Sequence, residues 1–458
     1  MRPVTVLDAQ LVSAPAYREY VAHFAAEYEN LAKVLRSFGL GVRAPGDARR
    51  RSSELIEELV RKGARVRNDG KSVVYGSLSP ACARCRTGNK SVSEFISLAC
   101  NRSCYFCFNP NQCDYERYRS SEKDWRTELE SFERSMGGLD CIALTGGEPL
   151  LHPEEAVEFF AFARALSPCA HLRLYTSGFG ADEALLRRLA DAGLDEIRYS
   201  VKLDEPAERQ AETLASLDAA VGIVPSVMVE MPVIPGTHDQ MVELLRHLDE
   251  VGARGINLLE FCFPLNNADE YKARGFELVG DPYRIPYDYG YAGALPVAGS
   301  EELALELMLE MVDGGCSLGL HYCSLENKNT AQVYEQNLGG QLSIPGYRFS
   351  HRTFFYEAAR AFGRDALELA RVLDAAGIEH TFDGDGRMVM FDPGELAGIS
   401  EEARSCAVYL SSAIIETDEA GGRTFREVGL QAVEPDDYRL LAADAAQPIE
   451  EGQGAHDR

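Results

Sequence analysis

Short apolar runs alternate with stretches of helical periodicity through the middle of the chain. The apolar runs that predict strands cover 94–100, 141–146, 172–178, 196–202, 226–233, 255–261 and 318–323. Residues 154–166, 182–193 and 238–252, which lie between several of these runs, repeat apolar side chains at helical spacing. Such alternation is typical of parallel βα units. The sequence therefore predicts an α/β core, built as an open doubly wound sheet or as a complete or partial barrel.

The chain before this core has a helical pattern. We expect residues 1–80 to form a helical N-terminal extension. Its apolar stripe repeats every three or four positions, at Tyr20, Phe24, Tyr28, Leu31 and Leu35. A second helix is predicted over 52–63, from a Ser52 cap to Gly63.

The core itself is expected to cover 81–325. Inside it, the Tyr-, Pro- and Gly-rich segment 264–300 interrupts the alternation and predicts a long ordered loop, either a lid or binding segment or a simple excursion. Residues 341–440 predict a small α+β C-terminal domain, with a helix over 354–377 followed by four strands. The tail, 441–458, predicts disorder.

Composition narrows the class of protein. The chain has 458 residues, 45% hydrophobic and 26% charged, which is ordinary for a folded soluble protein. With 46 Lys and Arg against 72 Asp and Glu, the net charge of −26 argues against a nucleic-acid partner held by phosphate attraction. We find no apolar run of about 18 residues, so no membrane span is expected. The beginning of the chain lacks a long apolar region, and we therefore expect a cytoplasmic protein.

Twelve cysteines need an explanation, and five of them lie within a stretch of 26 residues. In a reducing cytosol, clustered thiols favour metal ligation or catalysis over disulfides. Cys100, Cys104 and Cys107 form a C-x3-C-x2-C motif directly after a predicted strand. Three close thiolates suit three irons of a [4Fe–4S] cluster and leave the fourth iron open for a small molecule. A zinc knuckle is the alternative.

A glycine-rich turn follows the next predicted strand, with Gly146, Gly147, Glu148 and Pro149 in sequence. Two glycines let a ligand approach the backbone, and Glu148 and nearby carbonyls can accept hydrogen bonds from an ammonium group. The turn falls where barrel enzymes assemble their sites. By itself it would also fit an ordinary strand-to-helix turn.

These two motifs, in this order, resemble those of the radical S-adenosylmethionine (SAM) enzymes. The resemblance covers about 92–325 and implies a partial (β/α)6 TIM-like barrel. It implies that the three motif cysteines bind a [4Fe–4S] cluster, with Phe106 beside the last of them, and that Gly146–Pro149 contacts the amino group of SAM. In that family the reduced cluster cleaves SAM, and the 5′-deoxyadenosyl radical formed takes hydrogen from the substrate.

The resemblance also implies cofactor contacts at later strand ends. The candidates are Thr176, Ser177, Ser200, Lys202 and Asn257, with 229–236 expected near adenine and Glu260 beside Asn257. Strand-end position favours function, but each of these would also fit a residue that is merely exposed or hydrogen-bonded.

The outer cysteines predict a tentative second metal site. Cys82 and Cys85 form C-x2-C before the core, and Cys316 and Cys323 flank its last predicted strand, with His321 between them. Four thiolates, or three thiolates and the imidazole, could hold zinc or an auxiliary iron–sulfur cluster. Unligated buried or reactive cysteines are the alternative. This combination resembles a radical SAM subgroup described as similar to pyruvate formate-lyase activating enzymes.

Together these features predict a radical SAM enzyme that acts on a small molecule or a peptide. An activase that generates a glycyl radical on a partner enzyme is the alternative within the family. A non-enzymatic zinc or redox-sensing protein is the alternative outside it. The expected partners are an electron donor, such as a flavodoxin or ferredoxin, and the substrate, with neither nucleic acid nor membrane.

Overall fold

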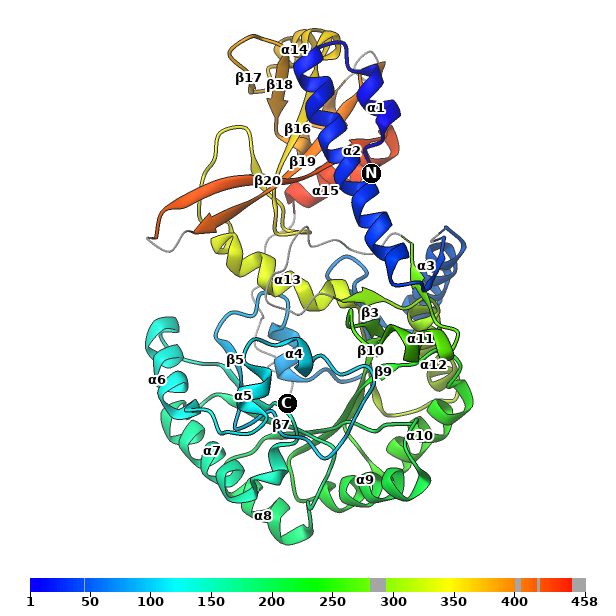
Figure 1. The fold of residues 1–458 in the computed structure, drawn as a ribbon, viewed down its shortest axis with the longest axis vertical. Helices are drawn as coiled ribbons and strands as arrows, with labels where there is room; N and C mark the ends of the chain where they lie inside the picture. The colour runs from blue at the N-terminus through cyan, green and yellow to red at the C-terminus, as the bar shows by residue number, and fades with distance from the viewer. Residues whose placement is uncertain (45, 281–293, 400–404, 418–420, 447–458) are drawn as a thin grey trace. The chain divides into compact units, whose positions relative to one another are not determined.

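The computed structural model describes residues 1–44, 46–280, 294–399, 405–417 and 421–446 (Figure 1). The chain folds as two compact units. The larger unit comprises 39–329, and the smaller one joins 1–38 to 330–458. The first 38 residues thus fold with the C-terminal part of the chain. The helical extension predicted over 1–80 is therefore not a unit of its own.

The larger unit is built on a nine-stranded sheet in the order β3-β4-β14-β10-β9-β8-β7-β6-β5. Its strands are β3 (Arg65–Arg67), β4 (Ser72–Tyr75), β5 (Ser91–Phe95), β6 (Cys141–Thr145), β7 (His171–Thr176), β8 (Glu196–Tyr199), β9 (Ser226–Val233), β10 (Gly255–Glu260) and β14 (Gly319–Cys323). The strands from β5 to β10 and β14 run parallel to their neighbours. β4 is antiparallel to β14, and β3 is antiparallel to β4.

Six helices alternate with the parallel strands and lie on the outside of the curved sheet in Figure 1. They are α6 (Trp125–Met136), α7 (Pro153–Leu166), α8 (Glu183–Asp191), α9 (Ala207–Ala220), α10 (His238–Val251) and α12 (Ser300–Asp313). Because β5 and β3 form the two edges of the sheet, the barrel is not closed. The predicted partial (β/α)6 TIM-like barrel is confirmed. No helix of the described residues is long and apolar enough to cross a membrane.

Alternation along the strands separates an apolar core from a polar barrel interior. Leu172 and Leu174 of β7 belong to the core between sheet and helices, together with Phe159 of α7. The intervening Arg173 and Tyr175 lie outside that core, since successive side chains of a strand point to opposite faces. This alternation decides which side chains can meet inside the barrel.

The rest of the larger unit corrects two expectations. The strand predicted over 94–100 ends at Phe95, and its apolar continuation packs in an irregular segment whose backbone bonds to residues 118–123. The segment 264–300 is not a simple loop. It contains α11 (Ala268–Ala273), β12 (Glu277–Val279) and β13 (Leu295–Pro296). β13 pairs with β11 (Cys262–Phe263), which precedes the segment, and β12 pairs with β2 (Gly41–Arg43). Residues 281–293 of this segment lie outside the described residues.

Four further helices complete the larger unit and the connection that leads out of it. They are α3 (Gly46–Arg61), which contains most of the helix predicted over 52–63, α4 (Pro80–Arg84), α5 (Tyr115–Tyr118) and α13 (Leu325–Gln336). The last of these spans the boundary between the two units.

The smaller unit is an antiparallel sheet in the order β1-β20-β19-β16-β18-β17, with β15 paired to β16. Its elements are β1 (Arg2–Pro3), β15 (Arg348–Phe349), β16 (Tyr356–Phe362), β17 (His380–Phe382), β18 (Met388–Phe391), β19 (Val408–Thr417), β20 (Arg423–Val433), α1 (Val6–Leu11), α2 (Pro15–Ser37), α14 (Arg364–Ala376) and α15 (Tyr438–Ala446). The predicted apolar stripe of α2 packs on one face of this sheet, where Phe24 joins Tyr409 and Leu430. Leu369 of α14 joins Leu410 on the other face.

Two expectations for the C-terminal part are also revised. The helix predicted over 354–377 is interrupted at Gly363, whose φ of +62° and ψ of −122° are not helical. The residues before it form β16, which lies between β18 and β19. The predicted disordered tail begins inside α15, and residues 447–458 lie outside the described residues.

Candidate active site

The three motif cysteines lie on the loop after β5, at the edge where the parallel strands end. Cys100 is exposed, whereas Cys104 and Cys107 are half-buried. The Cys107 N–H donates to the Cys104 carbonyl at 3.1 Å, which closes a turn between them. The three sulfurs are not all within 4.8 Å of one another. Two sulfurs on one zinc ion, each at about 2.3 Å, cannot be more than about 4.6 Å apart. The spacing therefore fits a cluster in which each cysteine holds a different iron.

A cation lies beside this cysteine loop. Lys202, just after β8, hydrogen-bonds to Cys104 and donates to Ser200 Oγ at 3.0 Å. Its ammonium lies 5.9 Å from the centre of the Phe106 ring. Burial raises the pKa of all three thiols of the loop, and the positive charge of Lys202 opposes that shift at each of them. The structure thus places Lys202 beside Ser200, Phe106 and the cysteine loop, and the lysine charge favours the thiolate form that iron binds.

The glycines of Gly146–Pro149 are required by packing within the protein itself. A Cβ added to Gly147 would lie 1.9 Å from the Ala99 carbonyl oxygen, and one added to Gly146 would lie 2.6 Å from that of Ser97. Gly146 also has a φ of +117°, which L side chains rarely adopt. The two glycines therefore let the turn press against the segment that leads into the cysteine loop. The sequence had instead indicated close approach of a ligand.

Glu148 holds two strand ends together. It is 2% exposed, and its carboxylate accepts four hydrogen bonds. Oε1 accepts from the Thr176 hydroxyl at 2.6 Å and from the Leu150 N–H at 3.1 Å. Oε2 accepts from both the N–H and the hydroxyl of Ser177, each at 2.7 Å. Because a carboxylate offers about four acceptor positions, this set uses all of them. The geometry assigns these side chains a positioning role at the turn.

Charged and amide side chains meet inside the barrel. Arg198 of β8 is 2% exposed and donates to Glu196 and Glu230, both at 2.6 Å. Asn257 donates to Glu230 at 2.7 Å, and its Oδ1 lies 2.8 Å from Nδ1 of His321. Asn257 was predicted at a strand end, but it is the third residue of β10 and is buried. It belongs to this interior network.

The sequence analysis did not single out Arg198 or Glu230. The available signal was a charged residue flanked by apolar ones within a predicted strand, at 198 in β8 and at 230 in β9. In a barrel whose outer face is covered by helices, such a residue must face the interior.

The short helix α4 brings Cys82 to this network. Its sulfur accepts from Asn257 Nδ2 at 3.2 Å and from Arg198 Nη2 at 3.4 Å. Burial raises the pKa of Cys82, but the Arg198 charge and a hydrogen bond with His321 outweigh burial and lower the pKa to about 6. The surroundings of Cys82 therefore favour its thiolate form.

Two of the other three outer cysteines lie near Cys82. Burial, followed by the charge of Cys82, raises the pKa of Cys85. Burial, followed by the charge of Cys85, raises that of Cys323 to about 12. Cys316 lies elsewhere, because it precedes β14 whereas Cys323 ends it, and the strand alone spans about 13 Å. Its charged neighbour is Asp249. The predicted set of four cysteines is therefore corrected to three.

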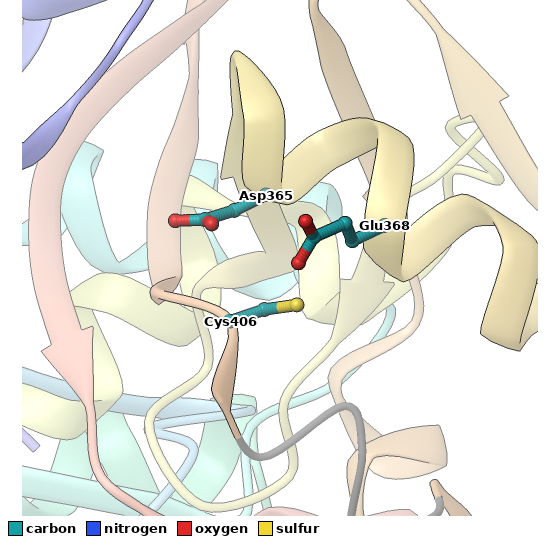
Figure 2. A group of neighbouring side chains, drawn as sticks. All are labelled: Asp365, Glu368 and Cys406. Carbon is teal, nitrogen blue, oxygen red and sulfur yellow. The ribbon is translucent and has the colours of Figure 1, made fainter.

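One further group of potential metal ligands occurs in the smaller unit. Figure 2 shows Asp365 and Glu368 of α14 with Cys406, whose ligand atoms all lie within 4.8 Å of one another. Asp365 accepts from the Ala407 N–H at 3.3 Å, and Glu368 pairs with Arg364 at 2.8 Å. Both carboxylates thus already have partners within the protein, and we assign no metal to this group.

The partial barrel and the cysteine loop at the carboxyl edge of its strands define a barrel enzyme built for an iron–sulfur cluster. Residues 95–248 match the family model described as the Radical SAM superfamily. This match contains the cysteine loop, the Gly146–Pro149 turn and Lys202. This part of the chain is a radical SAM domain.

Three relatives illustrate the range of similar proteins. A Methanocaldococcus jannaschii protein, provisionally named as a glycyl-radical enzyme activating enzyme, is 26% identical over 340 residues, which is 72% of this chain and 86% of that protein. GTP 3′,8-cyclase of Microcystis aeruginosa is 30% identical over 39% of this chain and 57% of its own length. PqqA peptide cyclase of Xanthomonas campestris is 35% identical over 26% of this chain and 30% of its own length. The three names describe different reactions.

Proposed function

We propose that Cys100, Cys104 and Cys107 bind the [4Fe–4S] cluster and that SAM binds at its open iron. The observation that carries this proposal is the loop itself, because it presents three sulfurs at the carboxyl edge of the strands with a spread too wide for one ion. When bound, the cluster and SAM supply an electron and a carbon radical that removes hydrogen from the substrate.

The chain's own residues prepare this site. Lys202 favours the thiolate state of the loop cysteines, which is the state that binds iron. Glu148, tied to Thr176 and Ser177, holds the turn against the cysteine loop, so that a ligand at the open iron meets a fixed backbone edge. The same residues are the proposed surroundings of SAM, together with Phe106 and Ser200.

The substrate is proposed to be a small molecule or a peptide held in the barrel interior. The interior offers hydrogen-bonding and charged groups at Arg198, Glu230 and Asn257, which suit a polar substrate. An electron donor such as a flavodoxin or ferredoxin is the proposed partner, and the cytoplasm is the proposed compartment.

An activase that generates a glycyl radical on a partner enzyme is the second candidate. The similarity over 72% of the chain to the provisionally named activating enzyme supports it. A deuterated substrate distinguishes the two, because deuterium from a small molecule or peptide would appear in 5′-deoxyadenosine. An activase would instead take hydrogen from a glycine of the partner enzyme and leave a glycyl radical visible by electron paramagnetic resonance (EPR).

A second metal centre, zinc or iron–sulfur, is also proposed at the outer cysteines. Its members are Cys82, Cys85 and Cys323, which interact electrostatically with one another, without Cys316.

Single Ala replacements of Cys100, Cys104 and Cys107 test the primary proposal. Each should abolish formation of 5′-deoxyadenosine from SAM, because each leaves one iron without its thiolate. Cys113→Ala is the matched control, since Cys113 is exposed and lies six residues beyond the motif. A near wild-type rate in any of the three replacements would overturn the assignment.

A further inference from the structure

We propose that the barrel interior holds an iron–sulfur cluster of its own, bound by Cys82, Cys85 and Cys323 with His321 as the fourth ligand. This site uses none of the residues of the SAM-binding loop. It specifies the second metal centre proposed above and rests on that proposal, and it can fail while the proposed SAM-binding cluster stands.

The three sulfurs come together from distant parts of the sequence. Cys82 and Cys85 lie on and just after α4, and Cys323 is the last residue of β14. Side-chain N–H groups point at two of the sulfurs. Cys82 accepts from Asn257 at 3.2 Å and from Arg198 at 3.4 Å. Asn327 donates to Cys323 at 3.3 Å. Hydrogen bonds to sulfur are the usual surroundings of metal-bound thiolates, whose electronic properties they tune.

The orientation of His321 is set by its neighbours. Asn257 uses its NH2 group to donate to Glu230 and Cys82, so its Oδ1 must accept, and Nδ1 of His321 carries the hydrogen of this 2.8 Å contact. Nε2 is then the basic nitrogen of the ring. It accepts from the Ser72 hydroxyl at 2.9 Å, a hydrogen bond that a bound iron would replace, and the strand register places Ser72 directly opposite Cys323. A ligating histidine whose other nitrogen is fixed by a hydrogen bond is the common pattern of metal sites.

Two buried guanidinium groups lie near the three sulfurs. Arg173 is 8% exposed, and its Nε has no hydrogen-bond partner among the described residues. Its charge acts on Glu230 as well as on Cys82 and Cys85. Arg198 donates to Cys82 at 3.4 Å. These positive charges would offset part of the negative charge of a thiolate-bound cluster.

The spacing argues against a single metal ion at this site. No three of Cys82, Cys85, Cys323 and His321 have their ligand atoms all within 4.8 Å of one another. A tetrahedral zinc ion with bonds of about 2.0–2.3 Å would need them closer than about 4.6 Å. An iron–sulfur cluster, whose protein ligands bind different irons, does not require so close an approach.

The proposal is tested by removing the ligands of the SAM-binding cluster and measuring the iron that the protein still binds. A variant with Cys100, Cys104 and Cys107 all replaced by Ala is purified without oxygen and reconstituted with iron and sulfide. We expect it to keep at least about two irons and matching sulfide per chain, with no SAM cleavage. Adding Cys82→Ser and Cys85→Ser should remove this remaining iron. His321→Cys in the same background should keep the iron but change its EPR or Mössbauer spectrum, because the ligand changes from nitrogen to sulfur.

Controls make each outcome decisive. Cys316→Ser and Cys169→Ser should leave the iron content unchanged, since both cysteines lie outside the proposed site. In the unaltered holoprotein, Cys82 and Cys323 should resist alkylation until the metal is stripped, a measurement that needs no variant. The proposal is overturned if the triple-Ala variant keeps its wild-type circular dichroism but binds no iron, or binds about one zinc instead. It is also overturned if these thiols are alkylated equally with and without metal.

Discussion

Replacing Glu148 separates a positioning role from direct contact with SAM. In Glu148→Ala, the buried N–H groups of Leu150 and Ser177 lose their acceptor, whereas the hydroxyls of Thr176 and Ser177 can rotate to other partners. Each unsatisfied buried donor costs roughly 1–3 kcal/mol, so the larger unit should lose about 2–6 kcal/mol. Glu148→Gln keeps one oxygen, and in either orientation its NH2 group faces one of the two N–H groups. Its expected cost is about 1–3 kcal/mol.

The chain contains a convenient probe for this measurement. Its single tryptophan, Trp125, is buried in α6 and packs against Phe159, so its fluorescence reports on the larger unit alone. Urea unfolding followed at this residue gives the change in stability. Hydrogen exchange of the Ser177 amide shows whether the loss is local. Thr176→Val is the matched control, since it keeps the carboxylate but removes the hydroxyl that donates to Glu148 and accepts from the Gly178 N–H. It leaves one buried N–H without its acceptor and should cost about 1–3 kcal/mol.

If Glu148→Gln unfolds at the wild-type urea concentration, with unchanged exchange at Ser177, but binds SAM much more weakly, then the carboxylate contacts the cofactor directly. If Glu148 has a positioning role, Glu148→Gln should lower the free energy of unfolding and the exchange protection of the Ser177 amide. Any loss of SAM affinity should then accompany these changes, because it results from the displaced turn.

Three further outcomes are expected. Burial raises the pKa of Glu260 to about 8 from an ordinary value of 4.5, so the free energy of unfolding should fall as the pH rises from about 5 through 8. In Glu260→Gln this pH dependence, measured by urea unfolding, should disappear, and the same pH dependence in variant and wild type would contradict the expectation. Lys202→Met should raise the pKa of Cys104 and slow its alkylation at pH 8 in metal-free protein, whereas equal rates would show that the lysine charge does not reach the thiol. Cys406→Ser should leave the iron and zinc content unchanged, and loss of one metal ion per chain would show that its group with the two acidic residues does bind metal.

The periodic spacing of apolar residues was sufficient to predict the strands and helices of the barrel, because this spacing is a local property of the sequence. The runs at 141–146, 226–233 and 255–261 correspond to β6, β9 and β10 within a residue or two at each end. The same reasoning failed at 354–377, where buried alanines fit a helix and a central strand equally well. A glycine at 363 and pairing with two neighbouring strands decided between them. Strand pairing is a long-range contact that the local pattern does not contain.

The division of the chain into two units likewise depends on long-range packing. The stripe of Phe24 and Tyr28 shows that one face of α2 is buried, but it does not show against what. The surface it covers includes Tyr409 and Leu430, nearly 400 residues further along the chain. An amphipathic helix specifies only that it needs an apolar partner. The predicted boundary at residue 80 therefore had no physical basis in the helix pattern alone.

The class of chemistry could be predicted from the amino-acid sequence alone, because the spacing of Cys100, Cys104 and Cys107 and the order of the two motifs are local features. The surroundings of the other polar residues, in contrast, follow only from the packing of the folded chain. This packing turned Glu148 into the centre of a hydrogen-bond set, moved Asn257 from a strand end into the barrel interior, and separated Cys316 from the other outer cysteines. These outcomes depend on which way a side chain faces in a curved sheet and on which strand lies next to which. Both are set by packing over the whole barrel, because a residue's neighbours in space come from strands that are far apart in the chain.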